Sequence, residues 1–508
     1  MRSVSPIHRF ATRLVLLSLL FLTVAAVAGR IKHVIVLMEE NRSFDHLFGY
    51  SNRTKRGLSG REVNPINDTN PTDGVIRVND NATYINECDP NHSLDATSYK
   101  IFGEEAFKVG NLSVPLMNGF VQWERDEDGH KDGRKSHYCG VMQAFAPEKL
   151  PVINKLAEEF LLFDNFYASV PGPTWPNRMF SYSGTSGGLT ATGPWYHLKT
   201  GHLFPQKTLF DQVAEQGGKW RLYYNDTPWE FYVQSIAHHP EHTRPVTEFF
   251  QDCRDGTLPH FSFINPRSGV NLTEGVGSND QHPDHDVAVG EQFIKDIYEA
   301  VRASPQWNET LLILTYDEHG GFYDHVKPPM GIPPPGDGEA SYPDKHFAFD
   351  RAGMRVPALL ISPWVKRGAV VSDPPAAAKP KPNSIFELTS IIQSTRSLLE
   401  VLHGTKPLTQ RDAWAADFSY LVNELDAPRT DCPEHLPAAP PPTEGGLMRE
   451  AHSGINELQE HIMTVHAHLA NEAAPHRAMM QHEVGPFVHR TRSTHVNNVS
   501  QWKASKNL

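Results

Sequence analysis

The sequence predicts an α/β protein built on a largely parallel β-sheet that is sandwiched by helices. Two short runs, 33–38 and 311–316, are rich in Val, Ile and Leu, which is typical of strands buried on both faces of a parallel sheet. Further strand-like runs alternate with segments of helical period, and they lie at 161–163, 220–224, 261–264 and 356–361. Alternation of this kind is the pattern of a layered α/β core.

Helices are predicted between these strands from their caps and apolar faces. Thr208 caps a helix over 209–216, and apolar residues recur along one face of a helix that starts at Val287. Ser384 and the glutamate three residues later form a capping box that opens a helix over 388–404.

The remaining segments suggest a catalytic domain over 29–432 with attachments. Residues 51–135 are rich in Asn, Asp and Gly and have little periodicity, so we expect an irregular insertion over the site. Residues 433–446 form a Pro-rich linker. In 447–508 apolar residues recur at helical spacing, which predicts a helical tail that packs on the main body. A helix lying on a membrane is less favoured, because the polar face carries Glu and His rather than Lys and Arg.

The N-terminus is typical of an export signal over 1–28. Three arginines precede an apolar stretch at 14–27, and small residues at 26–28 offer a cleavage site. The apolar stretch is short for a bilayer crossing, and an uncleaved signal anchor is the alternative. Nothing later in the sequence is long and apolar enough to span a membrane. We therefore expect a secreted or organelle-lumen protein with peripheral membrane contact, as a monomer or small homo-oligomer.

Export would place the cysteines in an oxidising compartment, where two disulfides are possible in any of three connectivities. The candidates are Cys88, Cys139, Cys253 and Cys432. Ten Asn-x-Ser/Thr triplets agree with a glycosylating pathway. The triplet that begins at Asn41 is in conflict with a role for that residue inside a site, because a glycan requires an exposed asparagine.

The formal charge of −12 over 508 residues excludes some partners. Nucleic-acid binding draws most of its affinity from clustered Lys and Arg, and a polybasic grip on anionic lipids needs the same residues. We therefore expect neither.

Each of the two longest strand-like runs ends in a pair of oxygen-bearing side chains. Glu40 and Asn41 follow the first run, and Asp317 and Glu318 follow the second. Because such sheets bind ligands at the carboxyl ends of their strands, we expect these four side chains to meet. Three buried acids repel one another unless a cation or an arginine neutralises them. A hard divalent ion such as Mg, Ca or Mn is the simplest neutraliser.

A hydroxyl and two imidazoles are the candidates for the chemistry. Thr174 lies among three prolines that fix the backbone, and a hydroxyl next to a metal or a base becomes a nucleophile. Its alternative role is to cap a helix that begins at Trp175. His92 and His282 lie in polar, proline-containing motifs, with a surface position as their alternative. Residues 317–325 carry five carboxyl or imidazole groups around a Gly pair, which is hard to explain by packing.

These motifs together resemble the phosphoesterase family, which includes plant non-specific phospholipases C, bacterial phosphocholine-hydrolysing phospholipases C and a related bacterial acid phosphatase. The resemblance covers about 30–431, with the motifs in family order. They are Glu40-Asn41-Arg42-Ser43-Phe44-Asp45, Thr174 with Pro176-Asn177-Arg178, His282-Pro283, Asp317-Glu318 through Asp324-His325-Val326, and Arg355-Val356-Pro357 with Ser362-Pro363. Strings at 304–310 and 411–414 resemble the plant branch most.

The resemblance implies an alkaline-phosphatase-like core and phosphoester hydrolysis through a covalent intermediate. It implies that Thr174 is the nucleophile and that His92 and His282 contact the phosphoryl oxygens or the leaving group. The implied metal ligands are Glu40, Asn41, Asp317 and Glu318. Supporting roles fall to Asn177, Arg178, His285, Asp324 and His325. The chain departs from the plant branch at Trp175, and bacterial members often have Ser at the position of Thr174.

The expected function is that of a secreted phospholipase C, which would release diacylglycerol from glycerophospholipids such as phosphatidylcholine at a membrane surface. A secreted acid phosphatase on soluble phosphomonoesters is the alternative within the same chemistry. A non-catalytic lipid- or glycan-binding protein is the alternative from another class.

Overall fold

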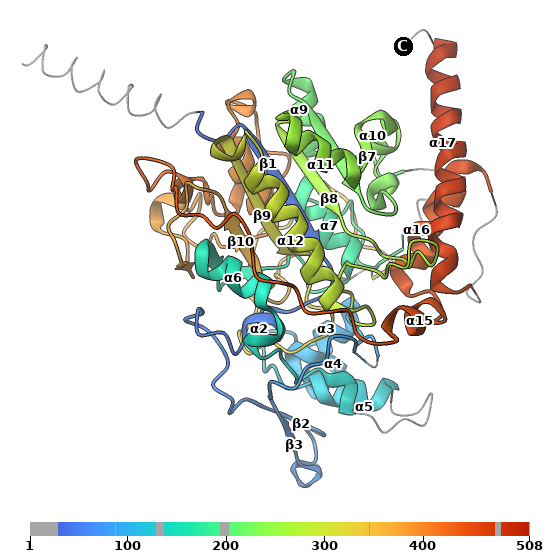
Figure 1. Ribbon diagram of the computed structural model, residues 1–508. Coiled ribbons are helices and arrows are strands. Elements are labelled where there is room, and N and C mark those ends of the chain that lie inside the picture. The colour runs from blue at the N-terminus through green and yellow to red at the C-terminus, as the bar shows by residue number, and fades with distance from the viewer. Residues whose placement is uncertain are drawn as a thin grey trace, which may run out of the picture.

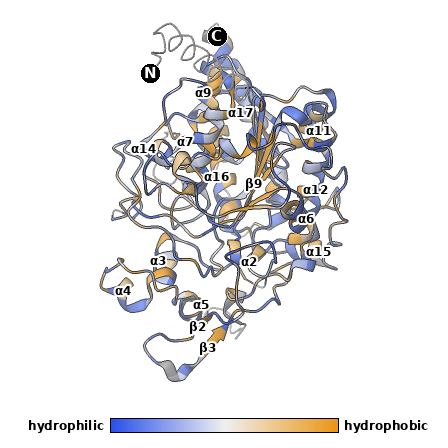
Figure 2. Ribbon diagram, turned by 90° about the vertical axis from the view of Figure 1, so that its left-hand side faces the viewer, coloured by the Kyte–Doolittle hydropathy of each residue, from blue (hydrophilic) through white to orange (hydrophobic). Residues whose placement is uncertain are grey.

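A mixed β-sheet of eight strands forms the centre of the computed structural model, which describes residues 29–86, 88–128, 137–193, 203–344, 346–472 and 479–506. The predicted export signal lies outside these residues. The strand order is β11-β4-β10-β9-β1-β8-β6-β7. Helices cover both faces, with α7 on one side of the sheet and α6 and α12 on the other (Figures 1 and 2). The predicted α/β sandwich is therefore confirmed.

The strands of this sheet are β1 (His33–Glu39), β4 (Leu161–Phe163), β6 (Trp220–Tyr224), β7 (Thr243–Pro245), β8 (Phe261–Asn265), β9 (Thr310–Tyr316), β10 (Ala358–Ile361) and β11 (Ala369–Val371). All neighbours pair in parallel except β10, which is antiparallel to both β9 and β4. The register of β1 and β9 pairs Glu39 with Tyr316. The residues that follow these two strands are thereby placed side by side at one edge of the sheet.

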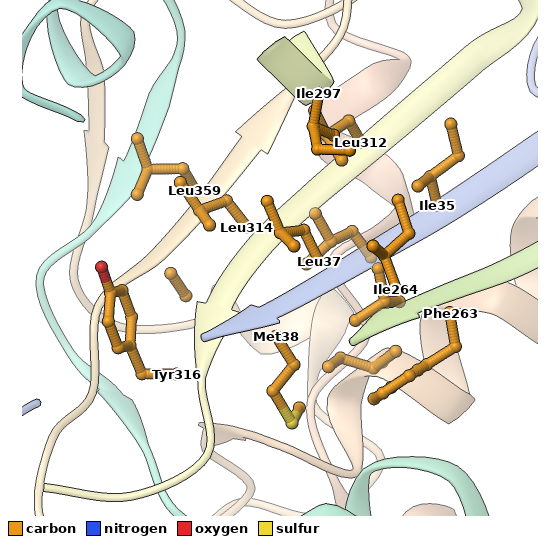
Figure 3. Close-up of a cluster of buried hydrophobic side chains, with 14 of the residues drawn as sticks. Ile35, Leu37, Met38, Phe263, Ile264, Ile297, Leu312, Leu314, Tyr316 and Leu359 are labelled. Carbon is orange, nitrogen blue, oxygen red and sulfur yellow. The ribbon is translucent and has the colours of Figure 1, made fainter. Parts of the chain in front are cut away.

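The apolar runs of β1 and β9 are buried on both faces of the sheet, as their sequences predicted. Figure 3 shows Ile35 and Leu37 of β1 near Leu312 and Leu314 of β9, and all four are almost fully buried. Met38 lies on the opposite face of the sheet, where it is also buried. Burial of each such side chain stabilises the fold by about 1.5–3 kcal/mol. The two strand ends that carry the predicted ligands are therefore held by a rigid core.

The main helices around the sheet are α6 (Pro151–Glu159), α7 (Thr174–Ser183), α9 (Leu209–Glu215), α11 (Val246–Asp255), α12 (Val287–Ala303) and α13 (Ser390–Leu398). The predicted helices at 209–216 and from Val287 are confirmed, and Thr208 caps α9 in a capping box.

The third predicted helix is wrong at its start. Residues 386 and 387 form strand β12 (Phe386–Glu387), which pairs with β5 (Phe166–Tyr167), and α13 begins only at Ser390. The expected cap is not made because Ser384 donates to the Trp414 carbonyl at 2.5 Å, while the Glu387 carboxylate accepts from the Ser169 hydroxyl.

The segment predicted as an irregular insertion is more regular than its composition indicated. It contains the hairpin of β2 (Val63–Pro65) and β3 (Val75–Arg77) and the helices α3 (Leu94–Phe102), α4 (Glu104–Lys108) and α5 (Phe120–Asp128). A small apolar cluster holds it together, in which Ile101, Phe102, Phe120 and Val121 of the insertion pack with Tyr323 and Met354 of the main body. It lies beyond the end of β1 and helix α2 (Phe44–Phe48), at the bottom of Figure 1.

One of the two possible disulfides forms. Cys88 and Cys139 are bonded, and their bridge ties the loop before α3 to the segment after α5. The prediction of a second bridge is wrong, because Cys253 and Cys432 are free and each is buried among apolar side chains of the main core. Burial raises the pKa of the Cys253 thiol, so this cysteine acts as a small core residue.

The C-terminal tail consists of α15 (Gly446–Ala451), α16 (Glu457–Ala470) and α17 (Val484–Lys506). Leu458, Ile462 and Val465 of α16 are buried in the main core, which confirms that the apolar stripe packs on the main body. None of the described helices combines the length and the apolar character that crossing a bilayer requires.

Candidate active site

The two pairs of oxygen-bearing side chains meet, as predicted, where β1 and β9 end. The Asn41 backbone N–H donates to Asp317 Oδ1 at 3.0 Å, and Glu40, Asn41, Asp317 and Glu318 are all fully buried. Asn41 has a positive φ of 56°, which turns the chain sharply after β1. A Cβ atom on Gly320 would lie 1.9 Å from the Asn41 carbonyl oxygen, so only glycine permits this approach.

Thr174 is the first residue of α7, and its hydroxyl points at the end of β1. The hydroxyl donates to Glu40 Oε1 at 2.7 Å and lies 3.4 Å from Asn41 Oδ1. The alternative role as a helix cap is wrong, because Pro173 is the N-cap residue and no side chain caps the helix. Thr174 is 2% exposed, and its hydroxyl is hydrogen-bonded to the Glu40 carboxylate.

Asn177 holds the proline-rich turn in front of Thr174. Its Nδ2 donates to the carbonyls of Val170, Gly172 and Pro173 at 2.9–3.2 Å, and its Oδ1 accepts from the Val170 N–H at 3.0 Å. A single side chain thus satisfies four backbone bonds in a turn whose prolines cannot donate. Its supporting role is to position the turn.

Arg178 neutralises two of the acids directly. One turn of α7 after Thr174, its guanidinium lies 2.7 Å from Glu40 Oε2 and 2.9 Å from Asp317 Oδ2, and it packs over the Trp229 ring. Burial raises the pKa of the Glu40 carboxyl well above its usual range, and the repulsion from Asp317 adds to this. Arg178 opposes both effects. The sequence analysis gave this residue only a supporting role.

His92 lies against the second pair of acids. Its Nδ1 donates to the Pro90 carbonyl at 2.8 Å, which directs Nε2 toward Asn41 Nδ2 at 3.3 Å and Glu318 Oε1 at 3.7 Å. Burial tends to raise the pKa of Glu318, but His92 and His319 outweigh it and lower that pKa. Glu318 is therefore an anion that faces an imidazole.

His282 is the second predicted histidine, and its ring centre lies 6.4 Å from that of His92. Its Nδ1 bonds to the Asp284 carboxylate, and its Nε2 is 3.7 Å from Asp89 Oδ2. Burial tends to lower the pKa of His282, but Asp89 and Asp284 outweigh it and raise that pKa. His282 is therefore suited to carry a proton near neutral pH.

His285 extends this row of groups toward the C-terminal tail. Its Nδ1 is 2.6 Å from Asp280 Oδ1, and its Nε2 is 3.4 Å from Asn456 Nδ2 and 3.9 Å from Glu450 Oε1. In addition, Gln481 of the tail donates to the Asp284 carboxylate at 3.1 Å. Sequence reasoning missed Asn456, Glu450 and Gln481, because nothing in the distant C-terminal tail points to His285 or Asp284.

Asp324 and His325 do not join this site. They lie with Asp45 and Arg355, where the guanidinium is 2.9 Å from Asp324 Oδ1 and 2.8 Å from Asp45 Oδ1. His325 Nδ1 is 2.6 Å from Asp45 Oδ2. The family motif therefore splits into a part at the site and a part in a separate, buried ion network.

The acids at the strand ends fit a divalent cation. Glu318 Oε1 is buried and, among the described residues, accepts no hydrogen bond, which leaves a carboxylate oxygen for an ion. Glu40, Asn41, Asp317 and Glu318 would hold it, and an all-oxygen set suits Mg, Ca or Mn. Elsewhere among the described residues, three groups of His, Asp and Glu bring ligand atoms within 4.8 Å of one another, around His242, around His282 and around His325. Each carboxylate oxygen of Asp284, Asp45 and Asp324 accepts a hydrogen bond, unlike Glu318 Oε1. Glu241 is ion-paired with Lys503.

The burial of Asn41 also settles the conflict over its glycosylation triplet. The side chain is fully buried against Thr174 and His92, so no glycan fits there.

Comparisons with known proteins agree with the motifs. The family model described as "Phosphoesterase family" matches residues 31–401. Non-specific phospholipase C1 of Arabidopsis thaliana is 40% identical over 419 residues, which cover 81% of this chain and 74% of that protein. Phospholipase C B of Mycobacterium tuberculosis is 26% identical over 478 residues, which cover 81% of this chain and 83% of that protein.

Among solved structures, a protein of the alkaline phosphatase superfamily from Vibrio parahaemolyticus is 14% identical, with a TM-score of 0.30. The match covers 50% of this chain and 60% of that one. We take the fold from the strand order above and not from this likeness, so the relation to the alkaline phosphatase core stays a prediction. The match to the family and the identity to the plant relative show that the chain belongs to the phosphoesterase family and is a phosphoric ester hydrolase.

Proposed function

We propose that this protein is a phospholipase C, which cleaves the glycerol-side phosphoester bond of glycerophospholipids through a phospho-threonine intermediate. The observation that carries the proposal is the Thr174 hydroxyl, which donates to Glu40 Oε1 at 2.7 Å beside the buried acids of β1 and β9. The similarity to plant and bacterial proteins named phospholipase C supports the lipid substrate.

In the first step the Thr174 oxygen attacks phosphorus and its proton passes to Glu40, which already accepts its hydrogen bond. The new Thr174–phosphorus bond forms as the bond to the glycerol oxygen breaks. A divalent ion held by the four oxygen ligands would stabilise the charge on the phosphoryl oxygens. Arg178 keeps Glu40 and Asp317 in place during this step by its two ion pairs.

The departing glycerol oxygen takes its proton from an imidazole. His282 suits this role because Asp89 and Asp284 raise its pKa, and His92 stands beside it next to Glu318. Diacylglycerol then leaves. Water then attacks the phosphorus and gives its proton to the imidazole. The Thr174 oxygen leaves and takes back the proton held by Glu40, which releases the phospho-headgroup and restores the hydroxyl.

The substrate approaches from the side of the histidines. Asp89 and Asp284 are partly exposed, whereas Thr174 and the four ligands are almost completely buried. We further propose that the chain is exported, loses residues 1–28, and carries glycans at Asn81 and Asn308, whose side chains are exposed.

Product analysis tests the reaction. Purified enzyme given phosphatidylcholine is expected to release diacylglycerol and phosphocholine. Phosphatidic acid and choline would point to the other ester bond, and a preference for a soluble phosphomonoester would make the enzyme a phosphatase. Acid quenching during turnover should trap a phosphate on the peptide that contains Thr174. If the enzyme is quenched during turnover and this peptide carries no phosphate, the covalent intermediate is contradicted.

A further inference from the structure

The insertion exposes an unusual apolar loop over 109–116. Val109 is 71% exposed, Val114 is 59% exposed and Leu116 is 52% exposed. Val109 and Val114 have the two highest values among the exposed large apolar side chains of the described residues, and Leu116 comes next after Val75 at 53%, level with Met448. Val75 lies in the same insertion, on hairpin β2–β3. Exposed apolar groups that gather in one segment mark a contact surface.

The loop is firmly anchored rather than loosely attached. The backbone N–H groups of Leu116 and Met117 both donate to the Ile101 carbonyl at 2.8 Å, and Leu112 packs on the small core of the insertion. Val109, Val114 and Leu116 are therefore presented to solvent by a folded support.

The loop lies close to the active site along the chain and in space. Helix α3 begins two residues after His92 and ends at Phe102, next to the carbonyl that anchors the loop. A helix of nine residues is about 14 Å long. Figures 1 and 2 place α3, α4 and α5 together beyond the end of β1. Thr174 bonds to Glu40 at that end of β1.

The lack of charge in the loop indicates which type of lipid surface it could contact. Residues 109–119 contain no charged side chain, and the chain as a whole carries −12. An anionic membrane would repel such a protein, whereas a zwitterionic surface offers an apolar interior without net charge. The uncharged, apolar loop therefore matches a phosphatidylcholine-type surface.

We propose that loop 109–116 is the membrane-docking surface of the enzyme, which inserts Val109, Val114 and Leu116 into a zwitterionic phospholipid layer beside the active site. This inference rests on the proposed function, because a lipid substrate is what brings the enzyme to such a layer.

The test separates docking from chemistry. Binding to phosphatidylcholine vesicles is measured by co-sedimentation in a Thr174→Ala background, so that the lipid is not consumed. Adding Val114→Glu and Leu116→Glu should weaken vesicle binding at least tenfold, which is about 1.4 kcal/mol. The matched control is Leu272→Glu, because Leu272 is a leucine of similar exposure, 42%, outside the insertion; it should leave binding unchanged.

Activity on soluble substrate is the second readout. With Thr174 restored, the double variant should hydrolyse monomeric short-chain phosphatidylcholine at the parental rate and lose activity only on vesicles. If the parental enzyme hydrolyses phosphatidylcholine neither as monomers nor in vesicles, the proposed function is wrong.

Three results would overturn the docking proposal while leaving the proposed function intact. One is vesicle binding that the double substitution does not weaken. Another is a self-associating parent that the same substitution makes monomeric, since a second copy would then cover the loop. The third is a glycan on Asn111 of the exported protein, because the triplet Asn111-Leu112-Ser113 lies within the loop.

Discussion

Two clusters in this protein are each built around a buried arginine and differ in whether their carboxylate oxygens all have hydrogen-bond partners. The open cluster consists of Glu40, Asp317, Glu318 and Arg178 with the Thr174 hydroxyl. The closed cluster consists of Asp45, Asp324, His325 and Arg355. Each brings buried carboxylates to a buried guanidinium, whose ion pairs are 2.7–2.9 Å long in both.

In the closed cluster every carboxylate oxygen has a partner. Asp324 accepts from Arg355 and from the N–H groups of Val326 and Asp45, and Asp45 accepts from Arg355 and His325. In the open cluster Glu318 Oε1 is left without a hydrogen bond. A satisfied network stabilises a fold, whereas a buried carboxylate oxygen without a hydrogen bond is available for an ion.

The largest expected effect is on the open cluster. Thr174→Ala should lower turnover by at least about 10⁴-fold, or about 5.5 kcal/mol of barrier, while the free energy of unfolding falls by only about 1 kcal/mol, because the substitution removes one hydroxyl and one methyl group. Initial rates of diacylglycerol release and urea unfolding measure the two quantities.

Thr315→Ala is the matched control for that substitution. Thr315 is also a buried threonine, but its hydroxyl donates to the Pro357 carbonyl at 3.0 Å, away from the acids. It should cost about 1 kcal/mol of stability and leave turnover intact. Parental activity in Thr174→Ala would show that another group is the nucleophile.

The closed cluster should respond in the opposite way. Arg355→Met leaves Asp45 and Asp324 buried without their guanidinium, so we expect the free energy of unfolding to fall by about 3–5 kcal/mol. Denaturant titration measures the loss. Any fall in kcat should then follow the fraction of folded enzyme. A variant of unchanged stability that lost its turnover would place Arg355 in the chemistry instead.

The two clusters also differ in how well the sequence predicted them. The apolar runs of β1 and β9 predicted both the strands and the meeting of Glu40 with Asp317, because a parallel sheet fixes where strand ends lie. Sequence could not separate Asp324 from Asp317, since seven residues of loop carry them to different networks. The sequence also could not show that Arg178 pairs with Glu40 and Asp317, because these ion pairs depend on how α7 is rotated.

Local chemistry was misleading in two further places. Ser384 and Glu387 have the spacing of a capping box, yet tertiary partners bind both side chains and the helix starts later. The composition of 51–135 suggested an irregular chain, but a small apolar cluster drawn from distant positions organises it into helices. Such long-range partners leave no periodic signal in the sequence.

Removal of a bound metal ion should affect the open cluster and not the closed one, and the expected loss of stability is smaller than that of Arg355→Met. Exhaustive chelation is expected to lower activity and to reduce the free energy of unfolding by about 2.7 kcal/mol relative to an ion held at a hundred times its Kd. Addition of Mg, Ca or Mn one at a time should identify the ion. Glu318→Gln should abolish the ion-dependent gain in stability, and Asp45→Asn should retain it. Activity that ignores chelation would mean that the acids act through hydrogen bonds alone.

The smallest effect concerns pH and belongs to the closed cluster. Burial tends to lower the pKa of His325, but Asp45 and Asp324 outweigh it and raise that pKa. The unfolded histidine has the lower pKa, so the charged imidazole stabilises the fold fully below pH about 6.5 and loses this contribution as pH rises through the folded pKa. The stability gap between the parent and His325→Gln should therefore be largest near pH 6 and shrink toward pH 9.

Equilibrium unfolding across that range measures the gap, with exposed His346→Gln as a control that leaves the slope unchanged. Because His325 has no contact with Thr174 or its acids, His325→Gln should keep the parental pH profile of kcat. A shifted kcat profile would mean that the two clusters exchange charge. In that case the closed cluster would be part of the active site and not only of its support.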